Sequence, residues 1–227
     1  MYQITLMSLD FSAQYVRDAV FADIPFLDVM SRHGVTLKIC NERLEKHLVE
    51  DEAEYDVIVT PGNSFGHMTG GFDGALVNVF GQELDERVRA HIEMAWCGEL
   101  PVGNARLIEL TANPHASWIV YTPTMRVPHR LPDNSEAPYI ATLAAFQRIR
   151  RWNQNKPKLH NSIVNILLPV MGMGTGGLNR DYVARQMQLA LIRAVECRSV
   201  KELGADGFRW ALAVTTQPQV PFNGGNL

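Results

Sequence analysis

The sequence has few cysteines, little net charge and no long apolar run. Its three cysteines, Cys40, Cys97 and Cys197, lie far apart, which excludes a zinc knuckle, a redox dithiol or a disulfide framework and fits a reducing compartment. The formal net charge of -3 gives no global support to nonspecific nucleic-acid binding. No run reaches membrane-spanning length, and Asp10 and Arg17 interrupt any signal-peptide core. We expect a soluble, cytoplasmic protein with a small partner, neither membrane nor nucleic acid.

The length of 227 residues and the 46% apolar content suit one domain with a full core. Short β-rich runs alternate with longer segments of helical period, which indicates an α/β fold with three layers, a mixed, mostly parallel sheet carrying helices on both faces. We expect strands at Gln3–Ser8, Val35–Cys40, Asp56–Thr60, Ala105–Leu110, Ser117–Thr122 and Ser162–Leu168. We expect helices at Phe11–Ala22, Asp73–Met94, Pro138–Asn153 and Asp181–Arg198.

A first glycine-rich loop follows a buried-type strand and runs into a helix, in the segment Tyr55–Leu76, YDVIVTPGNSFGHMTGGFDGAL. Glycine lets backbone N–H groups turn toward a ligand, and the positive end of the helix dipole adds to the field, so phosphate suits such a loop. Asn63 follows the strand and Asp73 lies at the helix start. Both side chains could serve a ligand, or Asn63 could make a turn and Asp73 cap the helix.

A second glycine-rich loop follows another buried strand, in the segment Ile163–Asn179, IVNILLPVMGMGTGGLN. Neither loop ends in the Lys-Ser or Lys-Thr pair of a Walker motif, and this loop lies too late in the chain for a dinucleotide fingerprint. A P-loop NTPase and a simple dehydrogenase are therefore disfavoured. The glycines could also serve only tight turns and helix packing, but two such loops at strand ends can meet over one ligand.

The two loops resemble those of the macro-domain family. In that family a strand ends in Asn-Ala-Ala-Asn and is followed by a glycine cluster and Val-Asp-Gly-Ala-Ile; VTPGNS and GGFDGAL are similar, with Thr60 in place of the first Asn. Asn63 and Asp73 match in order, as do the glycines between them. The segment Pro169–Gly177 is similar to the family's Ser-Thr-Gly loop, with Gly174 at its key glycine.

The resemblance covers roughly Tyr55 to Arg198, including GELPVGNARLIEL, which is similar to the family's proline-and-glycine motif before its next strand. It implies a single macro-like domain over residues 1–227, with an extra N-terminal strand and helix at 1–34, a macro core at 35–200 and an irregular tail at 217–227. Gly176 stands where the family often has an aromatic residue, so we expect a more open pocket there. The family's adenine-reading Asp falls on Glu42 beside Asn41, or on Asp10.

The resemblance further implies binding of ADP-ribose or an ADP-ribosylated substrate, with hydrolysis of the bond at the distal ribose. Asn63 would fix the ribose and Asp73 would orient the attacking water. Alternatives are a non-catalytic ADP-ribose reader and, more remotely, a nucleotide- or RNA-binding protein that uses the same cleft. The remaining ligand-binding residues are expected to be Asn41, Glu42, Thr60, Pro61, Gly62, Ser64, Gly70, Gly71, Phe72, Met171, Gly172, Met173, Gly174, Thr175, Gly176 and Gly177.

We expect neither a metal nor another cofactor. His115, His129 and His160 are isolated from any acidic or thiol cluster in the sequence. Arg126 could either reach a phosphate at the rim or be an ordinary surface arginine. The oligomeric state, the linkage that is cut and the carrier of the ADP-ribose are left open by the sequence.

Overall fold

The computed structural model describes residues 1–8, 24–111 and 113–197. Their strands form one sheet in the order β2-β1-β6-β3-β5-β4. Neighbouring strands are parallel except for β4 and β5, which are antiparallel. The strands are β1 Tyr2–Met7, β2 Val35–Cys40, β3 Tyr55–Asn63, β4 Arg106–Glu109, β5 Ala116–Met125 and β6 Asn165–Pro169.

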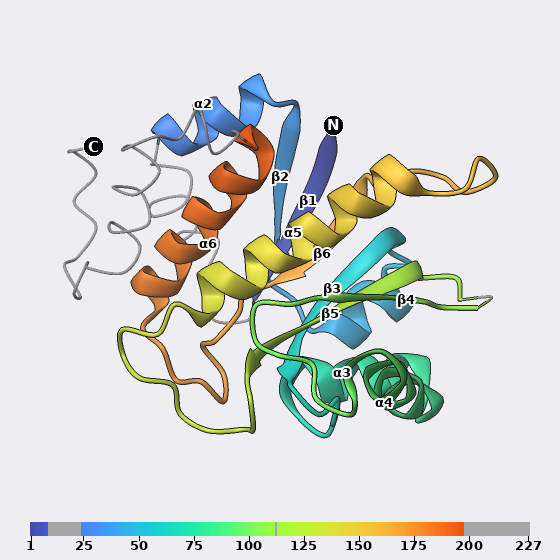
Figure 1. Cartoon of the computed structure of the whole chain (residues 1–227). Helices are drawn as coiled ribbons and strands as arrows, with labels where there is room; N and C mark the ends of the chain where they lie inside the picture. The colour runs from blue at the N-terminus through green and yellow to red at the C-terminus, as the bar shows by residue number, and fades with distance from the viewer. Residues whose placement is uncertain (9–23, 112, 198–227) are drawn as a thin grey trace.

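Helices cover both faces of the sheet, which confirms the three-layer α/β/α arrangement (Figure 1). One face packs against α2 Ile24–Arg32, α5 Ala137–Asn155 and α6 Arg180–Glu196, and the other against α3 Gly71–Phe80, α4 Glu83–Trp96 and the short π-helix η2 Lys46–Glu50. Each face has its own apolar cluster. Phe146 and Val183 belong to the first cluster, and Leu48, Leu76 and Val88 to the second.

The N-terminal strand lies inside the sheet. β1 pairs with β2 on one side and with β6 on the other. The segment 1–34, expected as an extra strand and helix, thus contributes β1 to the sheet and α2 to one helical layer. Pro25 in the first turn of α2 is compatible with a helix start, although the sequence patterns predicted no helix there. The helix expected at Phe11–Ala22 and the tail at 217–227 lie outside the described residues.

The single helix expected at Asp73–Met94 is wrong, because the structure has two helices there. Gly81 has φ 88°, which a helix interior does not allow, and its N–H donates to the carbonyl of Val77 to close α3. The chain then restarts as α4. β3 and β5 also run farther than expected, pairing as far as Asn63 and Met125 past a β-bulge at Gly62/Asn63.

β3 and β6 are parallel neighbours, with Val57 opposite Ile166 and Ile58 opposite Leu167. Their carboxyl ends therefore lie at the same edge of the sheet, where open α/β sheets place their ligands. The two glycine-rich loops leave the sheet from these ends (Figure 1). Among the described residues, no helix combines the length and apolar character needed to cross a membrane.

Candidate functional site

The start of the first glycine-rich loop is fixed by Tyr121, a buried residue of β5 that the sequence patterns did not single out. Its hydroxyl accepts a hydrogen bond from the N–H of Asn63 (3.0 Å) and donates one to the carbonyl of the same residue (2.8 Å). A Cβ on Gly62 would lie 2.0 Å from this hydroxyl oxygen, so only glycine fits there. Burial raises the pKa of Tyr121 far above its usual range, which keeps the hydroxyl protonated.

The amide side chain of Asn63 holds the next turn of this loop. Its Nδ2 donates to the carbonyl of His67 (2.7 Å), and its Oδ1 accepts from the N–H groups of Phe65 (3.1 Å) and His67 (3.4 Å). Only 5% of Asn63 is exposed. The turn-forming interpretation of Asn63 is therefore confirmed. Among the described residues, the carbonyl of His67 is the one acceptor recorded for Nδ2, so this amide can donate one further hydrogen bond.

Asp73 lies in the first turn of α3 and is almost completely buried, with 6% exposure. Its Oδ1 accepts a hydrogen bond from the hydroxyl of Thr60, at the end of β3. Burial raises the pKa of Asp73 from 3.8 to about 7; the Thr60 bond opposes this rise and the charge of Asp85 adds to it. Thr60 is fully buried, and its side chain supports Asp73. Contrary to our expectation, this side chain does not face a ligand.

Ser64 is also part of the frame of the loop. Its N–H donates to the carbonyls of Met125 and Arg126 (both 3.1 Å), and its carbonyl accepts from Leu100 (2.8 Å). Ser64 is 1% exposed, and Gly62 is buried as well. Gly62 and Ser64 were expected to bind the ligand; the structure buries both in the frame of the loop, so a direct contact with a ligand stays a prediction, whereas Pro61 is half-buried.

Asp85 of α4 fixes the distal part of the loop. Its Oδ1 accepts from the N–H of Met68 (2.8 Å), while Arg89 holds its Oδ2 (2.7 Å). Met68 is 2% exposed and belongs to the apolar cluster under α3 and α4. The loop is therefore fixed on α4 by the packing of Met68 and by a carboxylate, Asp85, that neither glycine spacing nor the family resemblance indicated.

The last part of the loop is open. Gly70 caps α3, Gly71 is its first residue, and no atom lies within 4 Å of the place where a Cβ would stand on either. Gly71 has φ 58°, a conformation that favours glycine. Phe72 is half-buried against the apolar cluster on this face. The first N–H groups of a helix, here those of Gly70, Gly71 and Phe72, have no partner within the helix and are therefore candidate donors to a ligand.

The second glycine-rich loop is a compact turn made by its own backbone. The N–H of Gly177 donates to the carbonyl of Gly174 (3.0 Å), and that of Leu178 to Gly172 (3.1 Å). Gly172 and Gly177 have φ of 85° and 62°. Within the described part of the chain, the N–H groups of Gly174 and Thr175 have no acceptor. These two residues are exposed, and no atom lies within 4 Å of a Cβ placed on Gly174.

The more open pocket expected at Gly176 stays a prediction, but the structure shows that no side chain would fit at this position. A Cβ there would lie 2.5 Å from the carbonyl oxygen of Gly172 and 2.9 Å from Cδ1 of Leu131. Leu131 also donates its N–H to the carbonyl of Gly176 (2.9 Å). Met171, expected to contact the ligand, has no exposed surface and belongs to the core, whereas Met173 is half-buried.

The linking segment 126–136 joins the two loops. The first loop bonds to its start through Ser64, and the second bonds to its middle through Leu131. At the rim, Arg126 lies over the ring of Phe65, 5.3 Å from the centroid, and makes a two-point ion pair with Glu99 (2.6 and 3.0 Å). That contact lowers the pKa of Glu99. Arg126 is thus a rim arginine that already has a partner.

The two residues proposed for adenine recognition follow β2, which β1 separates from β6. Asn41 is exposed. Glu42 is half-buried, and its carboxylate pairs with Lys46 (2.5 Å), which lowers the pKa of Glu42. Asp10 lies outside the described residues. Adenine recognition by Glu42 and Asn41 stays a prediction.

Comparison with known proteins agrees with this architecture. Residues 35–201 match the family model described as macro-like domain. The chain belongs to the macro-like domain family. It is similar to an uncharacterized protein of Aquifex aeolicus (strain VF5), with 29% identity over 136 residues, which is 60% of this chain and 72% of that protein.

Solved structures with the same fold include the Oceanobacillus iheyensis macrodomain. A glycine-to-valine mutant of it with ADPR has a TM-score of 0.51 and 19% identity, covering 64% of this chain and 74% of that one. The same macrodomain with ADP has a TM-score of 0.50 and 17% identity, covering 70% of this chain and 85% of that one. At this level of identity the similarity establishes the fold of the macro-like domain and nothing about individual site residues.

Proposed function

We propose that this protein binds ADP-ribose, with the diphosphate lying between the two glycine-rich loops. The observation that carries the proposal is the open backbone at Gly70, Gly71 and Gly174, where no atom takes the place of a side chain. Unpaired N–H groups beside such space, one set of them at the start of α3, suit a diphosphate. The Oceanobacillus iheyensis macrodomain, which shares the fold, is bound to ADPR in one structure and to ADP in another, and this supports the same class of ligand.

We further propose that the bound ligand is cleaved at the distal ribose by water. Asp73 supports this step because a carboxyl group with a pKa of about 7 can accept a proton near neutral pH. The water would attack the anomeric carbon while its proton passes to Asp73; the bond to the leaving oxygen would break with its electron pair on that oxygen, and Asp73 would return the proton to it or to solvent. The free Nδ2 hydrogen of Asn63 would fix the sugar, and the diphosphate held by the loops would assist the water.

A non-catalytic reader is the second candidate, and a specific observation favours it. The side chain of Asn63 already makes three hydrogen bonds to its own loop, and Asp73 is 6% exposed with Thr60 as its partner. A purely structural role would account for both residues. A reader would bind ADP-ribose and leave ADP-ribosylated protein intact.

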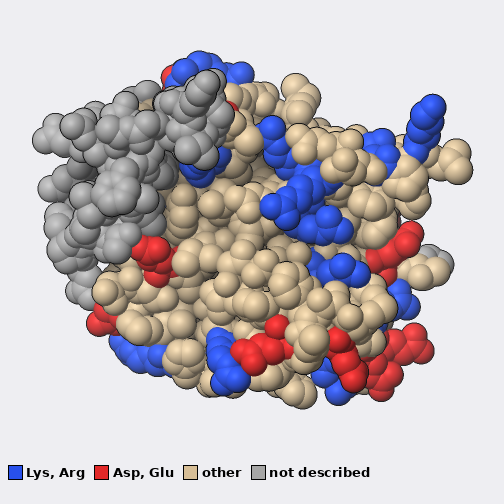
Figure 2. Space-filling view, viewed as in Figure 1, with Lys and Arg blue, Asp and Glu red and all other residues tan. Residues whose placement is uncertain are grey.

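Nucleic-acid binding at this cleft is less well supported. Lys and Arg side chains gather over α5, and Asp and Glu side chains over α4 (Figure 2). The α5 arginines include Arg148 and Arg151. Burial lowers the pKa of Arg148, and the positive charges of Arg106 and Arg151 lower it further. Arg148 lies ten residues after Pro138, roughly 15 Å along the helix from the end that contacts Gly172 of the second loop. The basic cluster on α5 therefore lies away from the glycine-rich loops, whose neighbouring arginines, Arg126 and Arg130, each pair with an acidic residue.

Titration calorimetry with ADP-ribose tests the binding proposal, with adenosine as the control that lacks the diphosphate. A ligand at about 100 times its dissociation constant should raise the thermal midpoint by roughly 5–10 °C. Release of ADP-ribose from acidic-residue-linked and serine-linked protein tests the hydrolysis. The absence of heat and of a midpoint shift with ADP-ribose would reject binding. Binding without release of ADP-ribose from either linkage would reject hydrolysis and support the non-catalytic reader.

A further inference from the structure

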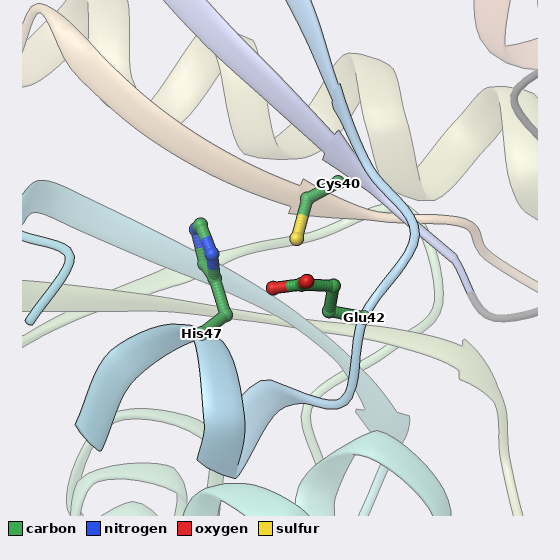
Figure 3. Close-up of side chains that lie close together, drawn as sticks. All are labelled: Cys40, Glu42 and His47. Carbon is green, nitrogen blue, oxygen red and sulfur yellow. The ribbon is translucent and has the colours of Figure 1, made fainter. Parts of the chain in front are cut away.

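A second group of chemically active side chains lies outside the glycine-rich loops. Cys40 is the last residue of β2, Glu42 follows in the turn, and His47 belongs to η2 (Figure 3). The thiol sulfur, a carboxylate oxygen and a ring nitrogen lie within 4.8 Å of one another. Among the described residues this is the one such group of three. Thiolate, imidazole and carboxylate are the ligands that zinc takes in proteins.

The His47 ring is already oriented by a residue outside the group. Its Nε2 lies 2.7 Å from the hydroxyl of Tyr55, on β3. Its Nδ1 remains, 3.9 Å from Oδ2 of Asp51. Histidines that bind a metal through one ring nitrogen commonly donate the other N–H to a fixed acceptor, which sets the ring orientation. The Tyr55 hydroxyl would take this position for His47 in the tautomer that carries its proton on Nε2.

The backbone places the three side chains without requiring a flexible loop. Leu48 of η2 is fully buried, which anchors the π-helix on the sheet, and Cys40 is 7% exposed at the end of a paired strand. The N–H of Asp51 donates to the carbonyl of Lys46 (3.0 Å), the five-residue bond of a π-helical turn. Such turns are rare and are frequently found at functional sites.

An open pocket of about 640 Å³ adjoins the group and includes all three residues in its lining. Thr5, Lys38 and Asn165 add polar atoms to its walls. A pocket of this size admits a hydrated ion and leaves room for water as a further ligand. Glu42 pairs with Lys46 through Oε1 and also makes a side-chain hydrogen bond with Asp51, so a metal bond to Glu42 would have to share or replace one of these contacts.

We propose that Cys40, Glu42 and His47 bind a divalent transition-metal ion, with Zn²⁺ as the best match to the sulfur, nitrogen and oxygen set. In a tetrahedral site with bonds of about 2.0–2.3 Å, ligand atoms lie roughly 3.3–3.8 Å apart, so the group, whose atoms lie within 4.8 Å of one another, would close by at most about 1.5 Å on binding. The thiol releases its proton to solvent as the Zn–S bond forms. The ion fastens η2 to the end of β2, and Glu42 then acts as a ligand and not as the adenine reader.

The purified full-length chain, stripped of metal, is titrated with Zn²⁺ and separately with Co²⁺. We expect one equivalent to bind, a thiolate-to-cobalt charge-transfer band in the near ultraviolet, and a higher thermal midpoint with Zn²⁺. Cys40→Ser and His47→Gln should each weaken binding at least about 100-fold, and Tyr55→Phe about 10-fold. None of these measurements requires ADP-ribose, so they are independent of the proposed function.

The matched controls are Cys97→Ser and His33→Gln, which remove an exposed thiol and an exposed imidazole elsewhere. Both variants should bind Zn²⁺ and Co²⁺ like the parent chain. Circular dichroism of each variant separates loss of the metal from loss of the fold. The proposal is overturned if the parent chain takes up less than one equivalent, if Cys40→Ser retains the charge-transfer band, or if Cys97→Ser abolishes it.

Discussion

The two glycine-rich loops are built in different ways. Side chains brace the first loop at several points, with Tyr121 at its start, Asn63 across its turn and Asp85 at its far part. The second loop is held by hydrogen bonds within its own backbone. It also accepts a hydrogen bond from the N–H of Leu131 at the carbonyl of Gly176. The first loop also contains Asp73, whereas residues 169–177 include no ionisable side chain.

This difference suggests a division of roles. Hydrogen bonds from side chains hold catalytic groups within the narrow range of positions that a reaction requires. An open backbone turn supplies N–H donors to a bound anion without positioning any catalytic side chain. We therefore expect substitutions of the bracing residues in the first loop to affect turnover or stability in addition to affinity, and substitutions at Gly174 to affect affinity alone. The following predictions test this division, beginning with the largest effect.

Asp73→Ala should reduce the release of ADP-ribose by about two to four orders of magnitude, the usual loss when a positioned acid or base is removed. Affinity for free ADP-ribose should change much less, since orienting the water matters chiefly in the transition state. Asn63→Ala should instead lower turnover, affinity and stability together, because it removes the loop bonds of Asn63 as well as a donor to the sugar. Full-rate release by Asp73→Ala would remove Asp73 from the mechanism.

The stability of the protein should depend on pH through Asp73. A folded pKa of about 7 against an ordinary value of 3.8 means that the folded state binds more protons between these values. The free energy of unfolding should therefore fall as pH rises from about 4 to about 7, by at most on the order of 4 kcal/mol, and then level off. Urea unfolding at pH 5 and pH 8 measures this, and Asp73→Asn should abolish that part of the fall. An equal fall in the variant would assign it to other groups.

Gly62→Ala should destabilise the fold by about 3 kcal/mol, because its Cβ would overlap the Tyr121 hydroxyl at 2.0 Å. Gly174→Ala is the control from the second loop. It has open space around its Cβ and should stay within about 0.5 kcal/mol of the parent chain. Chemical denaturation of both variants measures their free energies of unfolding. Equal values would show that the first loop shifts enough to accommodate a Cβ at position 62.

Gly174→Glu should lower the affinity for ADP-ribose at least about 100-fold, because a carboxylate would stand where the diphosphate lies. The fold should survive, since no atom lies within 4 Å of the new Cβ. Gly174→Gln, of similar size without the charge, separates steric exclusion from repulsion and should bind more tightly than Gly174→Glu. Circular dichroism and calorimetry on the same samples decide the matter, and unchanged affinity in Gly174→Glu would mean that this loop does not hold phosphate.

Sequence patterns predicted the layers of the fold because the alternation of β-rich and helical segments is local information. They also located both glycine-rich loops. The partner of each strand is not local, which is why the inward position of β1 between β2 and β6 was not foreseen. The break at Gly81 could have been found, since a glycine inside a helical pattern marks a possible end.

Within the site, sequence reasoning located the backbone of the loops but did not distinguish open glycines from packed ones. Gly174 and Gly176 are two residues apart, yet one faces empty space and the other touches Leu131, a residue from a distant segment. Tyr121 was missed for the same reason, because its contact with Gly62 joins residues 59 positions apart. The family pattern indicated Thr60 as a ligand-binding residue, whereas in the structure its hydroxyl donates a hydrogen bond to Asp73.

The smallest expected effect compares one arginine beside each loop. Arg126, near the first loop, is held by Glu99 and lies over Phe65; Arg130, whose Cγ is 3.6 Å from the Cβ position of Gly177, has one 3.4 Å contact with Asp133. Exposed ion pairs add little to stability, so neither Arg126→Ala nor Arg130→Ala should move the thermal midpoint appreciably.

Affinity should separate the two arginines. Arg130 is free to turn toward a phosphate on the second loop, so Arg130→Ala should weaken ADP-ribose binding on the order of 5-fold. Arg126→Ala should have a smaller effect, because Glu99 already occupies the guanidinium. Glu99→Ala releases Arg126 and is the informative control, since it should strengthen binding only if Arg126 can reach the ligand. Calorimetry at low salt measures all three, and a larger loss with Arg126→Ala than with Arg130→Ala would place the phosphates nearer the first loop than the second.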